Sequence, residues 1–186
     1  MAQYAVFLRG VNVGGNYKIR MSELKNVLEE KTFAEVHTYI NSGNLVVKSD
    51  TDKESVRNHI QSLIKSRFDL DVDLIVKTVS ELKQIINTDP FDDKKETQDS
   101  RKIMMLLSDA IDPDKLAKLK KELPLVENYY LFNDVIYIYY HNGSGRSKFS
   151  INLIERKFKV SATARNWNTL RKMSGMMEEN PLNQIF

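Results

Sequence analysis

The chain has 186 residues, of which 41% are hydrophobic and 28% charged, and this composition is typical of folded rather than disordered proteins. It contains no cysteine, which excludes disulfides, thiolate metal sites and cysteine nucleophiles. No stretch reaches the roughly 20 apolar residues that cross a bilayer. Because residues 1–9 also lack the pattern of a signal peptide, we expect a cytoplasmic protein with no membrane partner.

The first half of the chain predicts the order strand, helix, strand, strand, helix, strand. Apolar runs and alternating patterns mark strands at residues 4–8, 36–40, 45–48 and 72–76. Apolar residues at helical spacing mark helices around residues 24–28 and 56–68, and Ser22 is the expected N-cap of the first. A short connecting helix is expected after Thr78, because Thr78 and Glu81 have the spacing of a capping box.

The polar segment 87–101 contains Pro90 and almost no apolar residues, so it is the predicted linker between a unit at 1–86 and a unit at 102–186. The same element order then restarts. A strand at 103–107 precedes a helix capped by Asp112 with Pro113 at its first position. A hairpin turns at residues 133–134, and a helix at 151–158, a short strand at 160–163 and an extra C-terminal helix at 166–177 follow.

The two halves also share residues, which indicates an internal duplication. Leu63, Ile64 and Phe68 recur as Leu153, Ile154 and Phe158, ninety positions later. The same interval pairs the hairpins, with Tyr39 matching Tyr129 and Leu45 matching Val135. The sequence therefore predicts an α+β protein made of two consecutive ferredoxin-like (βαββαβ) units, each with an antiparallel sheet.

A glycine-rich loop, LRGVNVGG at residues 8–15, separates the first strand from the first helix. Glycines allow main-chain N–H groups to approach a ligand, and a following helix N-terminus favours anions. Arg9, Lys18 and Arg20 add positive charge around the loop. The spacing is neither G-x-G-x-x-G nor a Walker loop. The alternative interpretation is a tight turn that needs positive φ at Gly14 or Gly15.

Three motifs in order, LRGVNVGG, YINSGN at residues 39–44 and TARNWNT at residues 163–169, resemble an uncharacterised and largely bacterial family, the domain of unknown function numbered 1697. The resemblance spans nearly the whole chain. It implies two α/β plait subdomains, in agreement with the duplication. It implies no established activity, substrate or cofactor.

The candidate ligand-binding residues lie in these motifs: Arg9, Asn12, Gly14, Gly15, Ser42, Asn44, Arg165 and Asn166. In an antiparallel plait, the loop after Arg9 and the turn before Leu45 lie at the same end of the sheet. Our hypothesis is that Arg165 joins them in one cleft for a small anionic ligand or nucleotide. The alternatives are ordinary hairpin chemistry for residues 42–44, and helix-start capping by Asn166 beside an exposed Arg165.

Two other functions stay open. An enzyme of unrecognised class would use the same cleft, although no catalytic constellation is identifiable. A nucleic-acid-binding module would use residues 146–172, which carry eight basic residues and one acidic residue. Tyr137 and Tyr139 share a strand face and would stack bases, unless they pack between the two sheets or at a dimer interface. The three histidines do not have the spacing of metal ligands, so no metal or cofactor is expected.

Overall fold

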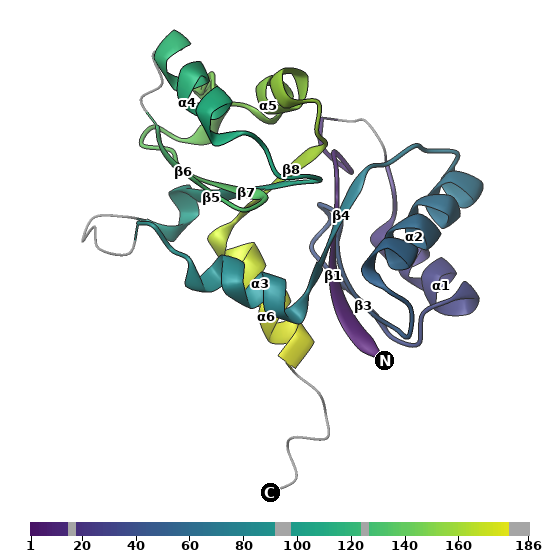
Figure 1. Cartoon of the computed structure of the whole chain (residues 1–186). Helices are drawn as coiled ribbons and strands as arrows, with labels where there is room; N and C mark the ends of the chain where they lie inside the picture. The colour runs from purple at the N-terminus through teal and green to yellow at the C-terminus, as the bar shows by residue number, and fades with distance from the viewer. Residues whose placement is uncertain (15–17, 92–97, 124–126, 179–186) are drawn as a thin grey trace, which may run out of the picture. The chain divides into compact units, whose positions relative to one another are not determined.

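The computed structural model describes residues 1–14, 18–91, 98–123 and 127–178. Two four-stranded antiparallel sheets are present, with strand orders β2-β3-β1-β4 and β6-β7-β5-β8 (Figure 1). In each sheet the first strand of its unit lies between the third and the fourth strands, as the βαββαβ connection requires. The predicted pair of ferredoxin-like plaits is therefore confirmed.

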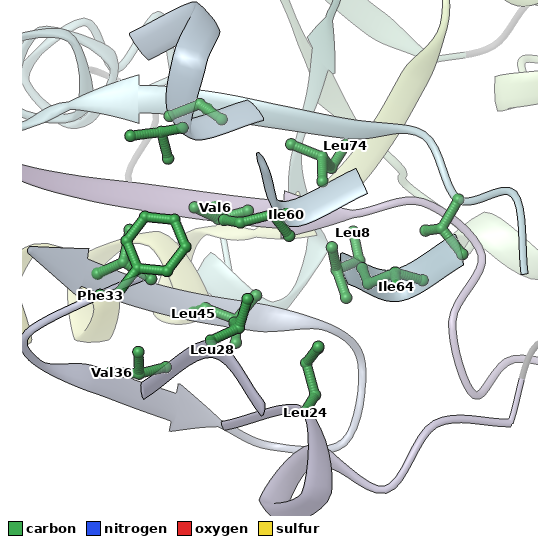
Figure 2. Close-up of a cluster of buried hydrophobic side chains, with 14 of the residues drawn as sticks. Val6, Leu8, Leu24, Leu28, Phe33, Val36, Leu45, Ile60, Ile64 and Leu74 are labelled. Carbon is green, nitrogen blue, oxygen red and sulfur yellow. The ribbon is translucent and has the colours of Figure 1, made fainter. Parts of the chain in front are cut away.

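In the first plait, α1 and α2 cover one face of the sheet and build a single core (Figure 2). Leu24 and Leu28 of α1 and Ile64 of α2 are fully buried there. The elements of this plait are β1 (Ala2–Leu8), α1 (Met21–Lys31), β2 (Val36–Tyr39), β3 (Asn44–Ser49), α2 (Lys53–Phe68) and β4 (Leu74–Thr78). A connecting helix, α3 (Val79–Asn87), follows β4.

The second plait repeats the arrangement, with α4 and α5 over one face of its sheet (Figure 1). Its core is smaller, and it includes the buried Leu116 and Leu119 of α4 and Ile154 of α5. Its elements are β5 (Lys102–Leu107), α4 (Pro113–Glu122), β6 (Asn128–Phe132), β7 (Val135–Tyr139), α5 (Ile151–Phe158) and β8 (Ala162–Asn166). The extra C-terminal helix is α6 (Trp167–Glu178), and two short 3-10 helices are η1 (Asp99–Arg101) and η2 (Ser144–Arg146).

The chain divides into two compact units, and the division differs in detail from the predicted boundaries. The first unit holds residues 1–84 and, from Arg171, the end of α6, while the second holds Ile85–Leu170. Residues 87–91 and 98–101 of the predicted linker belong to the second unit. Phe91 is buried against Tyr130 and Tyr139 at ring-centroid distances of 5.5 and 5.8 Å, so this end of the predicted linker is part of the packed structure.

The helical half of the predicted duplication is confirmed by matching helix ends. Phe68 and Phe158 end α2 and α5, and each is followed by a left-handed C-cap, Asp69 at φ 53° and Lys159 at φ 60°. The helices differ in length, since α2 has 16 residues and α5 has 8. The first two turns of α2 thus have no helical counterpart in the second unit.

The predicted match between the hairpins is wrong. The helix-covered face of the first sheet includes Leu45, and in the second sheet the same face includes Ile136 rather than Val135. Tyr129 likewise faces the helices, whereas Tyr39 pairs with Asn44 on the opposite face. The connection between β2 and β3 has four residues and the one between β6 and β7 has two, so a fixed interval cannot align both hairpins.

Local capping signals account for most helix starts, with one exception. The Thr78 N–H donates to Glu81 Oε2 at 2.7 Å and the Glu81 N–H donates to Thr78 Oγ1 at 3.2 Å, which confirms the predicted capping box. Asp112 caps α4 as predicted. Ser22 does not cap α1, because the helix already begins at Met21 and Arg20 occupies the cap position. The last strand also runs further than predicted, to Asn166.

Helices long and apolar enough to span a bilayer are absent from the described parts of the chain.

Candidate functional site

The loop after β1 is fixed by the side chain of Asn12. Its amide N–H₂ donates to the main-chain carbonyls of Ile19 at 2.8 Å and Asn41 at 2.7 Å, and its carbonyl oxygen accepts from the Ile19 N–H at 3.0 Å. Asn12 also has φ 57°, a left-handed conformation that asparagine tolerates well. The side chain therefore closes the loop on itself and ties it to the β2–β3 turn.

The β2–β3 turn is held by a second asparagine and a glycine. Asn44 is fully buried, and its amide donates to the Tyr39 carbonyl at 3.1 Å and to Ser42 Oγ at 3.0 Å. Gly43 has φ 75°, and a Cβ there would lie 2.6 Å from the Cβ of Leu8. The hydrogen bonds of Asn44 to Tyr39 and Ser42 are those of a hairpin turn, which is the alternative that the sequence left open.

The other predicted site residues of the glycine-rich loop are Arg9, Gly14 and Gly15. Gly14 has φ 62° and open space around it, as a turn position requires. Arg9 is partly buried, and its main-chain N–H donates to the Asp73 carbonyl at 2.8 Å. The predicted site residue Gly15 lies outside the described residues. That any of these positions contacts a ligand stays a prediction.

A hollow of about 1060 Å³ opens beside the start of α1, between the glycine-rich loop, the β2–β3 turn and the end of α2. Of the predicted site residues, Asn12 lines it, whereas Arg9, Gly14, Ser42 and Asn44 do not. Thr38, Asn41 and Phe68 line it as well, and no motif in the sequence pointed to Thr38 or Phe68. The lining residues are Asn12, Lys18, Ile19, Arg20, Met21, Ser22, Glu23, Lys25, Thr38, Asn41 and Phe68.

The charges around this hollow leave an excess of positive charge. Glu23, its one acidic lining residue, is paired with Arg67 at 3.0 Å. Lys25 is paired with Glu29 at 3.7 Å. Lys18 and Arg20 are exposed, and neither forms a salt bridge with another residue that the structure describes. Two cations of the hollow are thus available to an external anion.

The start of α1 differs from the start of α4, the equivalent helix of the second unit. The carboxylate of Asp112 accepts hydrogen bonds from the N–H groups of Asp114 at 2.9 Å and Lys115 at 3.4 Å. At α1 the cap residue is Arg20, whose side chain makes no capping hydrogen bond. The N–H groups at the first turn of a helix need an acceptor and attract negative charge. At α1 the residues of the first turn line the hollow, and no carboxylate among the described residues caps them as Asp112 caps α4.

The family model for a protein of unknown function (DUF1697) matches residues 1–137, well over half of the chain. The chain belongs to this family. The match covers the LRGVNVGG and YINSGN motifs, the whole wall of the hollow and the second unit as far as Tyr137. The TARNWNT motif lies beyond it. No curated protein matches the chain.

A solved structure shares the fold of this DUF1697 chain. It is "The structure of conserved bacterial protein SP0830 from Streptococcus pneumoniae", with a TM-score of 0.75 and 21% sequence identity. The similarity covers 95% of this chain and 98% of the other, so both plaits and their order are shared.

In the TARNWNT motif, Arg165 is buried rather than exposed. Its Nη1 donates to Thr163 Oγ1 at 2.7 Å and to the Ala164 carbonyl at 2.8 Å, and burial lowers the pKa of its guanidinium to about 10. Asn166 caps α6, since its side-chain oxygen accepts from the Thr169 N–H at 2.8 Å. Both residues belong to the second unit, whereas Asn12 and Ser42 belong to the first. That the four residues form one cleft therefore stays a prediction.

The basic segment 146–172 does not form a single basic surface within one element. Its basic residues are spread over η2, α5, β8, α6 and the connections between them, and Arg165 is buried. Tyr137 and Tyr139 are 0% and 6% exposed, so neither presents a ring face for base stacking. The Tyr137 hydroxyl donates to the Ile85 carbonyl at 3.1 Å, and burial raises the pKa of Tyr137 to about 12. These tyrosines pack inside the protein.

Proposed function

We propose that this protein binds a small anionic ligand at the start of α1. The observation that carries the proposal is the difference between the two equivalent helix starts. At α4 the carboxylate of Asp112 binds the N–H groups of the first turn. At α1 an exposed arginine, Arg20, stands at that position, and a hollow adjoins it. A phosphate or carboxylate of the ligand takes the role that Asp112 has in the second unit.

The chemistry of such a complex follows from the first turn of α1. The N–H groups of Ser22 and Glu23 occupy the second and third helical positions, which correspond to Asp114 and Lys115 of α4. Hydrogen bonds from such groups to an anion, with the favourable helix dipole, give a ready anion site. Lys18 and Arg20 add two cations, and charge-assisted hydrogen bonds are stronger than neutral ones.

The hollow is large enough for an organic ligand and not only for an inorganic anion, since ligand pockets commonly measure about 300–1,000 Å³. Its far wall carries Thr38 and Asn41, which offer hydrogen bonds, and the ring of Phe68. This combination favours an anionic metabolite with a partly apolar body, such as a nucleotide or a phosphorylated or carboxylated ring compound.

The test is a titration with phosphate, pyrophosphate, nucleotides and aromatic carboxylates, followed by calorimetry and thermal shift. A ligand that binds the folded state raises the melting temperature by mass action. The double variant Lys18→Ala/Arg20→Ala is expected to weaken binding by at least about tenfold, or roughly 1.4 kcal/mol. Arg20→Asp is expected to abolish binding while it stabilises α1, because an aspartate at this position can cap the helix as Asp112 caps α4.

The matched control removes two exposed lysines from the equivalent helix, Lys115→Ala/Lys118→Ala, and it is expected to leave binding unchanged. This control separates a local site from a general effect of net charge. The proposal is abandoned if no compound of the panel binds, or if the two double variants weaken binding equally.

A further inference from the structure

Strand β6 lies at one end of the second sheet, where it pairs with β7 on one side (Figure 1). Its five residues, NYYLF, contain no charge and no proline. Its main chain forms no hydrogen bond on the other side with any residue that the structure describes. Proteins usually protect such strands with charges, prolines, bulges or a covering element, because an open edge pairs readily with another chain.

The other three edge strands of the two sheets are protected. Beside β2, Glu35 pairs with Lys48 at 2.7 Å and lies 3.9 Å from His37, so charged groups accompany that edge. Strands β4 and β8 are largely buried: Leu74 to Lys77 are 2–7% exposed, and Ala162, Thr163 and Arg165 are at most 9% exposed. Strand β6 is the exception among the described edges.

The side chains of β6 make its edge apolar as well as open. Tyr130 and Phe132 are 47% and 39% exposed, which is unusual for large hydrophobic residues. Both project from the face opposite the α4–α5 layer, because Tyr129 and Leu131 pack into the helix-covered core. Lys120 lies over the ring of Tyr129 at 5.0 Å, on the helix-covered side. The residues of β6 on the face with Tyr130 are uncharged.

The hairpin geometry determines which main-chain groups point outward. The β6–β7 turn has two residues, with Asn133 at φ 52°, and Phe132 pairs with Val135. In such a hairpin the closing pair is hydrogen-bonded, and hydrogen-bonded and open pairs alternate along the strand. The N–H and C=O groups of Tyr129 and Leu131 therefore point away from β7.

We propose that β6 pairs antiparallel with β6 of a second copy of this chain, around a twofold axis at Tyr130. This register lets Tyr129 of each copy exchange hydrogen bonds with Leu131 of the other, so that all outward groups of these residues are used. Two four-stranded sheets then form one continuous eight-stranded sheet.

A second copy fits this strand because the strand is complementary to itself. The register places Tyr130 opposite Tyr130 and Tyr129 opposite Leu131, and aromatic–aromatic and aromatic–aliphatic pairs of this kind stabilise antiparallel strands. No like charges meet. In closed twofold assemblies the same patch of both subunits forms the interface, as it does here.

The experiment is sedimentation velocity of the full chain over a concentration series, with variants at the axis. The wild type is expected to dimerise. Tyr130→Lys and Tyr130→Glu are each expected to weaken dimerisation at least about tenfold, because like charges oppose each other across the axis. An equimolar mixture of the two variants is expected to form a heterodimer, since opposite charges then meet. Circular dichroism verifies that both variants are folded.

His37→Lys on β2 is the matched control, since it adds the same charge to an edge strand of the first sheet, and it is expected to leave the dimer intact. Phe132→Lys is a second variant at the β6 edge and should also weaken dimerisation. A monomeric wild type overturns the proposal. It is also overturned by a dimer that withstands Tyr130→Lys, or by a Tyr130→Lys and Tyr130→Glu mixture that stays monomeric.

Discussion

The two plaits have the same strand order, and α2 and α5 end in the same way, yet the plaits differ at the starts of α1 and α4, in the lengths of α2 and α5 and in their hairpin turns. The C-termini of α2 and α5 match down to the left-handed cap, whereas α2 extends two turns further at its start. The start of α4 is capped by Asp112 and the start of α1 is not. The helix ends stay alike where Phe68 and Phe158 pack against the two cores, whereas the helix starts have diverged.

The differences also divide the two units by chemistry. The first unit has a hollow with available cations at a helix start, whereas the second has an open apolar strand. Our two proposals therefore assign a small anion to the first unit and a second copy of the chain to the other. Each prediction below changes a residue of one unit and compares it with a matched residue of the other.

The largest effect is expected at Lys102. Its ammonium lies 2.6 Å from Asp89 and 3.3 Å from Asp99, and its side chain is only 5% exposed. Burial alone would lower its pKa, but the hydrogen bonds and charges of the two aspartates raise it. Lys102→Gln removes the positive charge beside Asp89, whose side chain is only 11% exposed, and this is expected to cost about 3–5 kcal/mol of unfolding free energy in urea denaturation.

The comparison for Lys102 is Lys53, which forms an ion pair of the same 2.6 Å length with Glu81 in the first unit. There the two side chains are 45% and 34% exposed. Lys53→Gln is expected to cost less than about 1 kcal/mol, because solvent screens the pair. Equal losses for the two variants would show that burial does not determine the strength of these pairs.

Gly43→Ala is expected to have the next largest effect. The added Cβ would meet the Cβ of Leu8 at 2.6 Å, in a residue already at φ 75°. Overpacking and backbone strain together predict a loss of about 2–4 kcal/mol, measured by urea denaturation. Gly143 of the second unit has nearly the same φ, 78°, but nothing within 4 Å of its Cβ position. Gly143→Ala should therefore cost only the strain, about 1–2 kcal/mol.

Local signals in the sequence predicted most of the fold. The Thr78–Glu81 capping box, the Asp112-Pro113 helix start and the apolar periodicities depend on neighbouring residues, so they can be read without tertiary contacts. The hairpin match failed because a change in loop length shifts the register, and no local pattern reveals which face a strand presents. The start of α1 was missed because Ser22 is a good cap residue, but Met21 is already buried in the core.

The candidate site was predicted only in part, and for a related reason. The motifs are rich in Asn, Gly and Ser, which serve turns as well as ligands. The side-chain amides of Asn12 and Asn44 both bind main-chain carbonyls. Asn12 binds Asn41, which lies 29 residues further along the chain, and Asn44 binds Tyr39 within the same turn. Lys18 and Arg20 were noted beside the loop. Phe68 could have been found only from the position of the α2 end next to α1.

Ile40 provides a test of strain in the hairpins. It has φ 48° in the β2–β3 turn, although β-branched residues avoid this region. Asn133, in the β6–β7 turn, has nearly the same φ of 52° and is well suited to it. Ile40→Asn is expected to stabilise the protein by about 1 kcal/mol, and Asn133→Ile to destabilise it by about 1–2 kcal/mol, in thermal and urea unfolding. If Ile40→Asn lowers stability, the exposed isoleucine makes compensating contacts in the folded protein.

The smallest effects are expected at the two helix ends that match. Asp69 and Lys159 are left-handed C-caps at φ 53° and 60°, a position that glycine occupies without strain. Asp69→Gly and Lys159→Gly should each stabilise the protein by about 0.5–1 kcal/mol. Asp69 is 95% exposed, and Lys65 retains its contact with Asp71 at 3.0 Å, so the lost ion pair matters little. Equal gains would show that the duplicated ends are energetically as well as geometrically equivalent. A gain at only one would mean that the neighbouring residues, and not the cap geometry, determine the stability of that helix end.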